Sequence, residues 1–282
     1  MQEQDVTSLS SVTDVANHLA DLLNAHPSAV FSDFDGTLSP VAPTPDAAVA
    51  APGVPETLRA LADRVSLVGI VTGRGIDDVM SRVSVADLLY VGNHGLEWLE
   101  NDEHHVHPAG LEAESGLPEA LREIEHRLKA HMPLEGVIFE NKRYSGSIHY
   151  RLSAEPGKTG DVLGPITREI ASEYGFWVSD GKMVMELRPG AMVNKGSAVH
   201  RIVTERHLQS AVFLGDDVTD ADAFVVLNTL RKEQGIRTCS VGVLTLDTDQ
   251  RVIDNSDFLL DGVDDVVSML LELVALLPTA DE

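Results

Sequence analysis

Two aspartates separated by one residue follow a short apolar run near the start of this 282-residue chain. The segment at 31–38 reads Phe-Ser-Asp-Phe-Asp-Gly-Thr-Leu, so Asp33 and Asp35 lie just past an expected buried strand. Gly36 lets the chain turn sharply there. Neighbouring carboxylates can divide nucleophilic and acid–base roles when their environments separate their pKa values. Taken alone, the pair also suits an ordinary turn at a strand end.

Two more motifs fall at similar places. Val-Thr-Gly-Arg at 71–74 ends another apolar run, and Asn-Lys-Gly at 194–196 opens an expected helix. The positive end of a helix dipole disfavours Lys195, and an anion bound between them would remove that conflict. The simpler alternatives are that Thr72 caps a helix beginning near Gly75 and that Lys195 is a solvated surface residue.

A fourth motif, Leu-Gly-Asp-Asp-Val-Thr-Asp at 214–220, again follows an apolar run. Asp216 and Asp217 are adjacent, and Asp220 follows within one helical turn. Carboxylate oxygens suit a hard divalent cation. The alternative is that Asp217 or Thr219 only caps the next helix.

The elements that must position these motifs alternate between strands and helices. We expect a helix over 13–25, strands at 29–32, 67–71, 211–214 and 239–243, and helices near 53–63, 75–83, 195–207, 219–231 and 262–277. This alternation predicts an α/β fold: a Rossmann-like parallel sheet with helices on both faces. All four motifs then fall at the carboxyl ends of strands or beside them, where open α/β sheets bind ligands.

The middle of the chain follows another pattern. A helix containing Leu117 and Leu128, apolar runs at 136–140 and 145–151, a second helix, and a strand pair turning at Asp180-Gly181 predict an α+β insert. We place this insert over 108–189, which splits the α/β core into 1–107 and 190–282.

Composition limits the kinds of partner. The formal charge of −24 opposes binding to nucleic acid or an anionic membrane. A single cysteine, Cys239, excludes a disulfide framework and a cysteine-based zinc site. With no signal-like N-terminus and no run long enough to span a membrane, we expect a cytoplasmic protein, favoured as a monomer, that acts on a small molecule.

Taken in order, the four motifs resemble those of the haloacid dehalogenase (HAD) superfamily. From about 29 to 265 the chain is similar to the trehalose-6-phosphate phosphatases within it. Further segments carry this resemblance: Gly-Asn-His-Gly at 92–95, Glu-Asn-Lys at 140–142, His-Tyr-Arg at 149–151, and the longer stretches 181–189 and 215–224. Ala221 departs from the family, which usually has glutamate there.

The resemblance implies a Mg²⁺-dependent phosphatase. Asp33 would be the nucleophile and Asp35 the general acid–base, while Thr72, the Gly73 amide and Lys195 would hold the phosphate. The cation would bind Asp33, the Asp35 carbonyl and Asp216, with Asp217 acting directly or through water.

The resemblance also assigns sugar contacts. In the insert, which would act as a cap, these are Glu140, Lys142, Arg151, Lys182 and Glu186, and on the core side Arg74, Asn93 and His94. Alternation along strands puts Glu140 with Lys142, and Lys182 with Glu186 and Arg188, on shared faces. The alternative for the cap residues is an exposed cross-strand ion-pair ladder. His104, His105 and His107 could bind a metal, although a solvated loop is the simpler interpretation.

Three other functions stay open. They are a phosphatase for another sugar or pseudo-disaccharide phosphate, a phosphosugar mutase, and a non-catalytic sensor. Intact Asp33, Asp35, Lys195 and Asp216 disfavour the sensor, because a sensor needs no nucleophile.

Overall fold

The computed structural model describes residues 9–190, 193–246 and 248–279. It divides the chain into two compact units, one formed by 1–104 with 194–282 and the other by 105–193. The expected boundaries at 107/108 and 189/190 lie three to four residues away from these. Within the described part of the chain, every helix is too short or too polar to cross a membrane.

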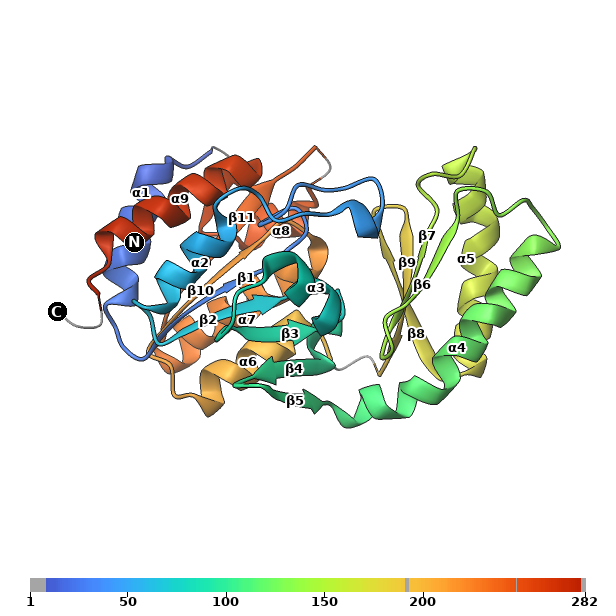
Figure 1. The fold of residues 1–282 in the computed structure, drawn as a ribbon, viewed down its shortest axis with the longest axis horizontal. Coiled ribbons are helices and arrows are strands. Elements are labelled where there is room, and N and C mark those ends of the chain that lie inside the picture. The colour runs from blue at the N-terminus through green and yellow to red at the C-terminus, as the bar shows by residue number, and fades with distance from the viewer. Residues whose placement is uncertain (1–8, 191–192, 247, 280–282) are drawn as a thin grey trace. The chain divides into compact units, whose positions relative to one another are not determined.

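The first unit is built on an eight-stranded sheet with the order β12-β11-β10-β1-β2-β3-β4-β5 (Figure 1). The six strands from β12 to β3 are parallel, and β4 runs antiparallel to β3. The strands are β1 (Ser28–Ser32), β2 (Leu67–Val71), β3 (Leu89–Gly92), β4 (Glu97–Glu100), β5 (Glu103–Val106), β10 (Ser210–Gly215), β11 (Arg237–Leu244) and β12 (Phe258–Asp261).

Helices cover both faces of this sheet. One apolar core packs α1 (Val12–Leu23), α2 (Val54–Ala62), α3 (Ile76–Val83) and α9 (Gly262–Leu276) on one face. A second core packs α6 (Lys195–Glu205), α7 (Val218–Gln234) and α8 (Gln250–Asn255) on the other. Strand residues alternate between these cores: Val30 contributes to the first, and Phe31 to the second. Because helices cover both faces of the sheet, every residue of β1 is buried, including the serines at its two ends.

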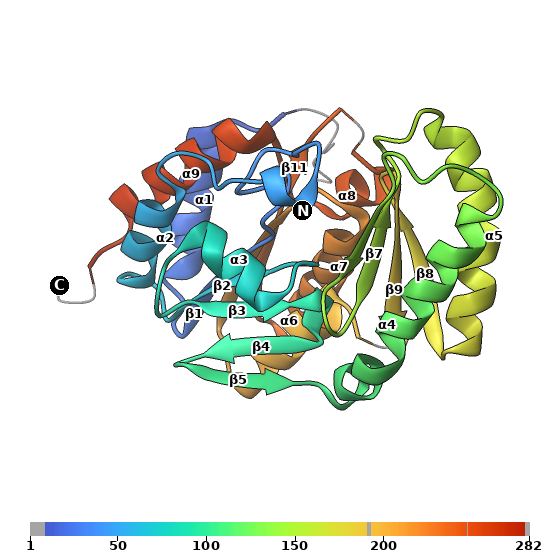
Figure 2. The ribbon, with the colours of Figure 1, turned by 45° about the vertical axis from the view of Figure 1, so that its right-hand side comes forward.

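The second unit has a four-stranded antiparallel sheet with the order β6-β7-β9-β8. Its strands are β6 (Ile138–Asn141), β7 (Gly146–His149), β8 (Phe176–Gly181) and β9 (Val184–Pro189). Figure 2 shows α4 (Pro108–Lys129) and α5 (Pro156–Glu173) on one face of this sheet, where they bury its apolar side chains. The other face carries the polar residues of each strand, since side chains alternate.

The α/β prediction is confirmed, and the four strands and six helices expected for the core are present to within a few residues. Strands β3, β4, β5 and β12 were not predicted. The sequences of β4 and β5, Glu-Trp-Leu-Glu and Glu-His-His-Val, are polar because these strands lie at the half-exposed edge of the sheet.

The predicted turn at Asp180-Gly181 is wrong. Both residues extend β8 and pair with Met185 and Val184, so the chain turns at Lys182 and Met183. Met183 takes the left-handed conformation with φ of 60°. Lys182 therefore lies in the turn, and its expected place on a strand face with Glu186 and Arg188 is also wrong.

Candidate active site

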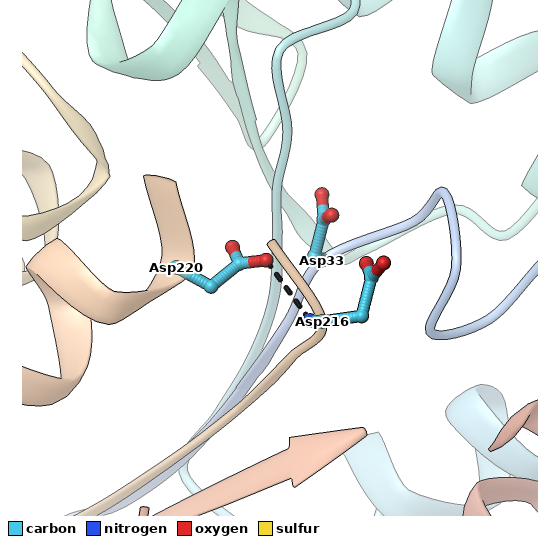
Figure 3. Close-up of side chains that lie close together, drawn as sticks. All are labelled: Asp33, Asp216 and Asp220. Carbon is cyan, nitrogen blue, oxygen red and sulfur yellow. Dashed lines mark hydrogen bonds between the residues drawn. The ribbon is translucent and has the colours of Figure 1, made fainter. Parts of the chain in front are cut away.

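Two acidic side chains meet where the strand order of the large sheet reverses. The chain leaves β1 for β2 on one side, and β10 pairs with β1 on the other. Asp33 follows β1 and Asp216 follows β10, so their side chains rise from adjacent strand ends (Figure 3). This switch point is the usual ligand crevice of an open α/β sheet.

Asp220, near the start of α7, completes an acidic cluster. Oxygen atoms of Asp33, Asp216 and Asp220 all lie within 4.8 Å of one another, and all three residues are buried. One Asp220 oxygen accepts hydrogen bonds from the backbone amides of Asp216 (3.1 Å) and Asp217 (3.0 Å). Asp220 thus holds the backbone turn at 216–217, which positions the Asp216 side chain.

Lys195 balances part of this charge. Its Nζ lies 2.8 Å from Asp33 Oδ1 and 2.7 Å from Asp220 Oδ1, and its side chain is only 2% exposed. Asn194 caps the helix that Lys195 begins, by accepting from the Ser197 amide. The solvated-lysine alternative is therefore wrong. The conflict with the helix dipole is relieved in this structure by two carboxylates.

Burial and crowded charge perturb both groups. Burial is the largest cause that raises the pKa of Asp33 well above its usual value, and the charge of Asp220 adds to it, while Lys195 opposes the rise. Burial alone would lower the pKa of Lys195, but the charges of Asp220 and Asp33 outweigh it and raise the value. The cluster therefore carries excess negative charge that a cation would relieve.

The donor set fits a hard divalent cation such as Mg²⁺, because every candidate ligand is oxygen. Asp220 is already bonded to Lys195 and to two amides, so Asp33 and Asp216 are the better candidates to hold the ion. Gly36 leaves the necessary room: a Cβ there would lie 2.3 Å from Cγ of Asp216, and its φ is 80°.

Asp217, a further predicted metal ligand, is the N-cap residue of α7. Its side chain accepts from the Val218 amide at 2.7 Å, and it forms a reciprocal capping box with Asp220. The capping alternative is therefore observed, and a metal contact by Asp217 stays a prediction.

Asp35 is paired with Arg74. The guanidinium of Arg74 contacts both carboxylate oxygens, with Nε 2.6 Å from Oδ2 and Nη2 2.8 Å from Oδ1. The Asp35 side chain is 38% exposed, whereas that of Arg74 is 9% exposed. Arg74 was expected to contact sugar, yet its nitrogens are bonded here to Asp35, to Asp78 and to the Pro45 carbonyl.

The strand ends of β2 and β3 bring Thr72 and Gly73 together with Asn93 and His94. Thr72 Oγ1 accepts from the Arg74 amide at 3.2 Å, and the His94 amide donates to the Thr72 carbonyl at 2.9 Å. His94 lies so close to Gly73 that a Cβ on the glycine would sit 2.5 Å from Nε2. Asn93 donates to Glu97 at 2.6 Å.

The sequence did not point to Glu97, and it pointed to Asp220 only as a further acid of the fourth motif. Buried Glu97 accepts from Asn93 and the Ile76 amide, and it pairs with His104 at 2.8 Å. It therefore fixes the segment after β3. The sequence offered little sign of this, because β4 was not recognised as a strand. The spacing of Asp220 from Asp217 is that of a capping box, which is a sign of its structural role.

The three histidines near 104–107 do not form a metal cluster; the acidic cluster above is the one that the described residues contain. His107 instead caps α4 by accepting from the Ala109 amide at 3.2 Å.

In the second unit, Glu140 and Glu186 occupy one row across the polar face of the sheet, with Ser147 between them. Lys142 Nζ and Ser147 Oγ lie 3.2 Å and 3.3 Å from Glu186 Oε1, and Arg188 lies 3.6 Å from Oε2. The Lys142 and Glu186 side chains are only 9% and 15% exposed. An ion-pair ladder exists, but it is not the exposed one considered above.

The other two predicted cap residues lie at a neighbouring turn. Arg151 Nη2 donates to the Lys182 carbonyl at 3.0 Å. Glu140 pairs with His149 at 3.1 Å, also on the polar face. All five predicted sugar contacts are therefore on the polar face of this sheet or in the turns beside it.

Comparison with known proteins gives a consistent result. A family model described as trehalose-phosphatase matches residues 31–255. Trehalose-phosphate phosphatase of Mycobacterium tuberculosis is 35% identical over 251 residues, which cover 85% of this chain and 63% of the relative. The chain thus spans less than two thirds of the length of that protein. The M. leprae trehalose-phosphate phosphatase is 36% identical over 217 residues, 73% of this chain and 49% of its own.

Among solved structures, the C-terminal domain of trehalose-6-phosphate phosphatase from C. albicans superposes with a TM-score of 0.77 at 22% identity. The match covers 95% of this chain and 98% of that one, and it supports the fold of the chain. The family match, which extends from before Asp33 to beyond Asp216, leads to one conclusion: this chain belongs to the trehalose-phosphatase family.

Proposed function

We propose that this protein hydrolyses trehalose 6-phosphate to trehalose and phosphate, in trehalose biosynthesis. The observation that carries the proposal is the buried group of Asp33, Asp216 and Lys195 at the switch point of the sheet. A buried aspartate held 2.8 Å from a lysine and beside a second carboxylate suits attack on phosphorus better than a structural role. The family and the curated relatives supply the substrate.

In the proposed reaction, an oxygen of Asp33 forms a bond to phosphorus as the bond to the sugar oxygen breaks. Asp35 donates a proton to the departing oxygen, which leaves as the sugar hydroxyl. Water then attacks the aspartyl phosphate, Asp35 takes its proton, and phosphate leaves. Lys195, Thr72 and the Gly73 amide hold the phosphate oxygens, where charge stabilisation does most of the work.

Mg²⁺ held by Asp33 and Asp216, with the Asp35 carbonyl and Asp217 as further predicted ligands, would offset the charge of nucleophile and phosphate. The buried, all-oxygen donor set supports this choice of metal.

We assign the sugar contacts to the unit 105–193 acting as a substrate lid. Its polar sheet face presents Glu140, Lys142 and Glu186 in fixed positions, which suits hydroxyl recognition. Charged groups that pair with hydroxyls contribute about 1.5–3 kcal/mol each. Arg151 and Lys182 at the adjacent turn, and Asn93 and His94 in the first unit, are the further candidates.

The test is a phosphate-release assay of the purified protein with Mg²⁺ across a panel of sugar phosphates. The proposal expects trehalose 6-phosphate to be preferred over glucose 6-phosphate. Preference for another disaccharide phosphate would keep the proposed reaction and show that the proposed substrate is wrong. Conversion of glucose 1-phosphate to glucose 6-phosphate would identify a mutase, and binding without turnover would identify a sensor.

A further inference from the structure

Four alternating charges form a continuous chain that ends on Asp35. Arg74 holds both oxygens of Asp35, and its remaining terminal nitrogen, Nη1, lies 2.6 Å from Asp78 Oδ2. Asp78 also pairs with Arg82, whose Nη2 and Nε lie 2.6 Å and 3.0 Å from Asp78 Oδ1. We call Asp35, Arg74, Asp78 and Arg82 the charge chain.

The charge chain is anchored on α3 and on the segment 45–48 of the first unit. Asp78 and Arg82 are four residues apart on α3, the spacing at which helical side chains meet. Arg82 also donates to the Ala48 carbonyl at 2.5 Å, and Arg74 donates to the Pro45 carbonyl at 3.1 Å. Arg82 thus ties α3, and Arg74 ties the residues just before α3, to the segment 45–48, which follows Asp35 in the sequence.

The two arginines of the charge chain are shielded from water, whereas the Asp35 and Asp78 side chains are 38% and 36% exposed. The Arg74 and Arg82 side chains are only 9% and 12% exposed, so their pairs are screened less than surface pairs. Planar, two-point contacts of arginine with carboxylate also fix orientation, which lysine cannot do. Of the two ends of the charge chain, Asp35 is the more exposed, at 38% against 12% for Arg82, and it is the member to which the proposed function gives a proton transfer.

We propose that Asp78 and Arg82 are positioning residues for Asp35, acting through Arg74. The inference rests on the proposed function, in which Asp35 protonates the leaving oxygen as the bond from phosphorus to that oxygen breaks. A carboxylate has more lone-pair sites than the two that Arg74 occupies. Arg74 can therefore orient Asp35 and leave the other lone pairs of its oxygens available for proton transfer. The role that we propose for Arg74 is to orient Asp35, which differs from the sugar contact expected from the sequence.

Varying the leaving group separates the effect of the Asp35 position on proton transfer from the effect of each variant on folding. A series of aryl phosphates whose phenols differ in acidity needs no sugar recognition, and the weaker phenols need protonation most. We would measure kcat/KM with Mg²⁺ across this series for wild type, Asp35→Asn and Asp78→Asn. Asp77→Asn is the matched control, since Asp77 is the exposed neighbour of Asp78 in the same helical turn.

The expected result is a steeper dependence on phenol acidity for Asp35→Asn, and a smaller steepening for Asp78→Asn. For the least acidic phenol, Asp78→Asn should lose about 10- to 100-fold, since misplacement by about 1 Å can cost on the order of 100-fold. Asp77→Asn should match wild type. Arg82→Lys keeps the charge and loses the two-point contact, so it should make kcat/KM slightly more dependent on phenol acidity. This variant provides the test if Asp78→Asn does not fold.

The double variant decides whether Asp78 acts through Asp35. If it does, adding Asp78→Asn to Asp35→Asn should cause little further loss. Equal losses at every phenol, or additive losses in the double variant, would overturn the inference while leaving the proposed function intact. If Asp35→Asn itself leaves the series unchanged, the role of Asp35 in the proposed function fails, and the inference fails with it.

Discussion

Lys195 Nζ lies 2.8 Å from Asp33 Oδ1 and joins the first residue of α6 to the residue after β1. The two residues are 162 positions apart in the sequence, as their numbers show. Asp33→Asn should abolish turnover and prevent trapping of covalent phosphate, because the amide is a poor nucleophile. Quenched-flow trapping with labelled substrate measures both. Retention of more than a few per cent of activity would exclude Asp33 as the nucleophile.

The same cluster predicts an unusual dependence of stability on pH. The folded pKa of Asp33 is raised, chiefly by burial, so the folded state holds the proton more tightly than the unfolded state does. The free energy of unfolding of the metal-free protein should therefore lose a contribution as pH rises from about 4 through the folded pKa. The Asp33→Asn variant has no proton to lose at this position, so its free energy of unfolding should rise relative to that of wild type as the pH rises.

Thermal unfolding in EDTA between about pH 4 and pH 8 tests this directly. The difference in Tm between Asp33→Asn and wild type should grow with pH, and Asp77→Asn should show no such trend. Mg²⁺ should raise the Tm of wild type more than that of Asp33→Asn, since it binds the folded state. A Tm difference that shrinks with rising pH would contradict the predicted direction.

Gly36 and Gly53 offer a matched pair of substitutions. Both have positive φ, 80° and 85°, but a Cβ on Gly36 would collide with Asp216 while one on Gly53 meets nothing within 4 Å. Each alanine should cost about 1–2 kcal/mol of stability from the left-handed backbone. Only Gly36→Ala should also lose Mg²⁺-dependent activity, because Asp216 must move.

Unfolding in urea and phosphate release measure the two effects separately. Equal activity of the two alanine variants would show that Asp216 need not keep its position.

Metal dependence follows from the oxygen-only donor set. Dialysis against EDTA should stop phosphate release, and Mg²⁺ should restore it. Ca²⁺ should support the reaction poorly, since it relaxes the octahedral geometry that Mg²⁺ demands. Full activity after exhaustive removal of metal would rule out this site.

Glu186 tests the role of the second unit. Its carboxylate is held by Lys142 and Ser147 on the polar sheet face. Glu186→Ala should lower kcat/KM for trehalose 6-phosphate by about 1.5–3 kcal/mol, on the order of 10- to 150-fold. The slow hydrolysis of p-nitrophenyl phosphate, which lacks a sugar, should change little.

Glu169→Ala is the matched control. Glu169 pairs with Arg127 across the two helices of this unit, and both side chains are partly or largely exposed. It should leave both substrates unaffected. Parallel losses on both substrates in Glu186→Ala would indicate a structural ion pair and remove Glu186 from the sugar site.

The sequence by itself determined the α/β fold, four of the six parallel core strands and the positions of the four motifs. Apolar runs such as 67–71 are buried on both faces of a parallel sheet, so their composition reports their place. The apolar stripes of the helices are likewise local, and local patterns can be read from one segment. Edge strands β4 and β5 could not be read, because a half-exposed strand need not be apolar.

Only the tertiary structure decided which charges meet. Lys195 lies against Asp33 and Asp220, and Arg74 bridges Asp35 and Asp78; the partners come from different strand ends and helices. The turn at Lys182-Met183 was likewise set by pairing of β8 with β9, which drew Asp180 and Gly181 into the sheet against their turn preference. Contacts between distant segments depend on packing and register, which the order of residues in any one segment does not contain.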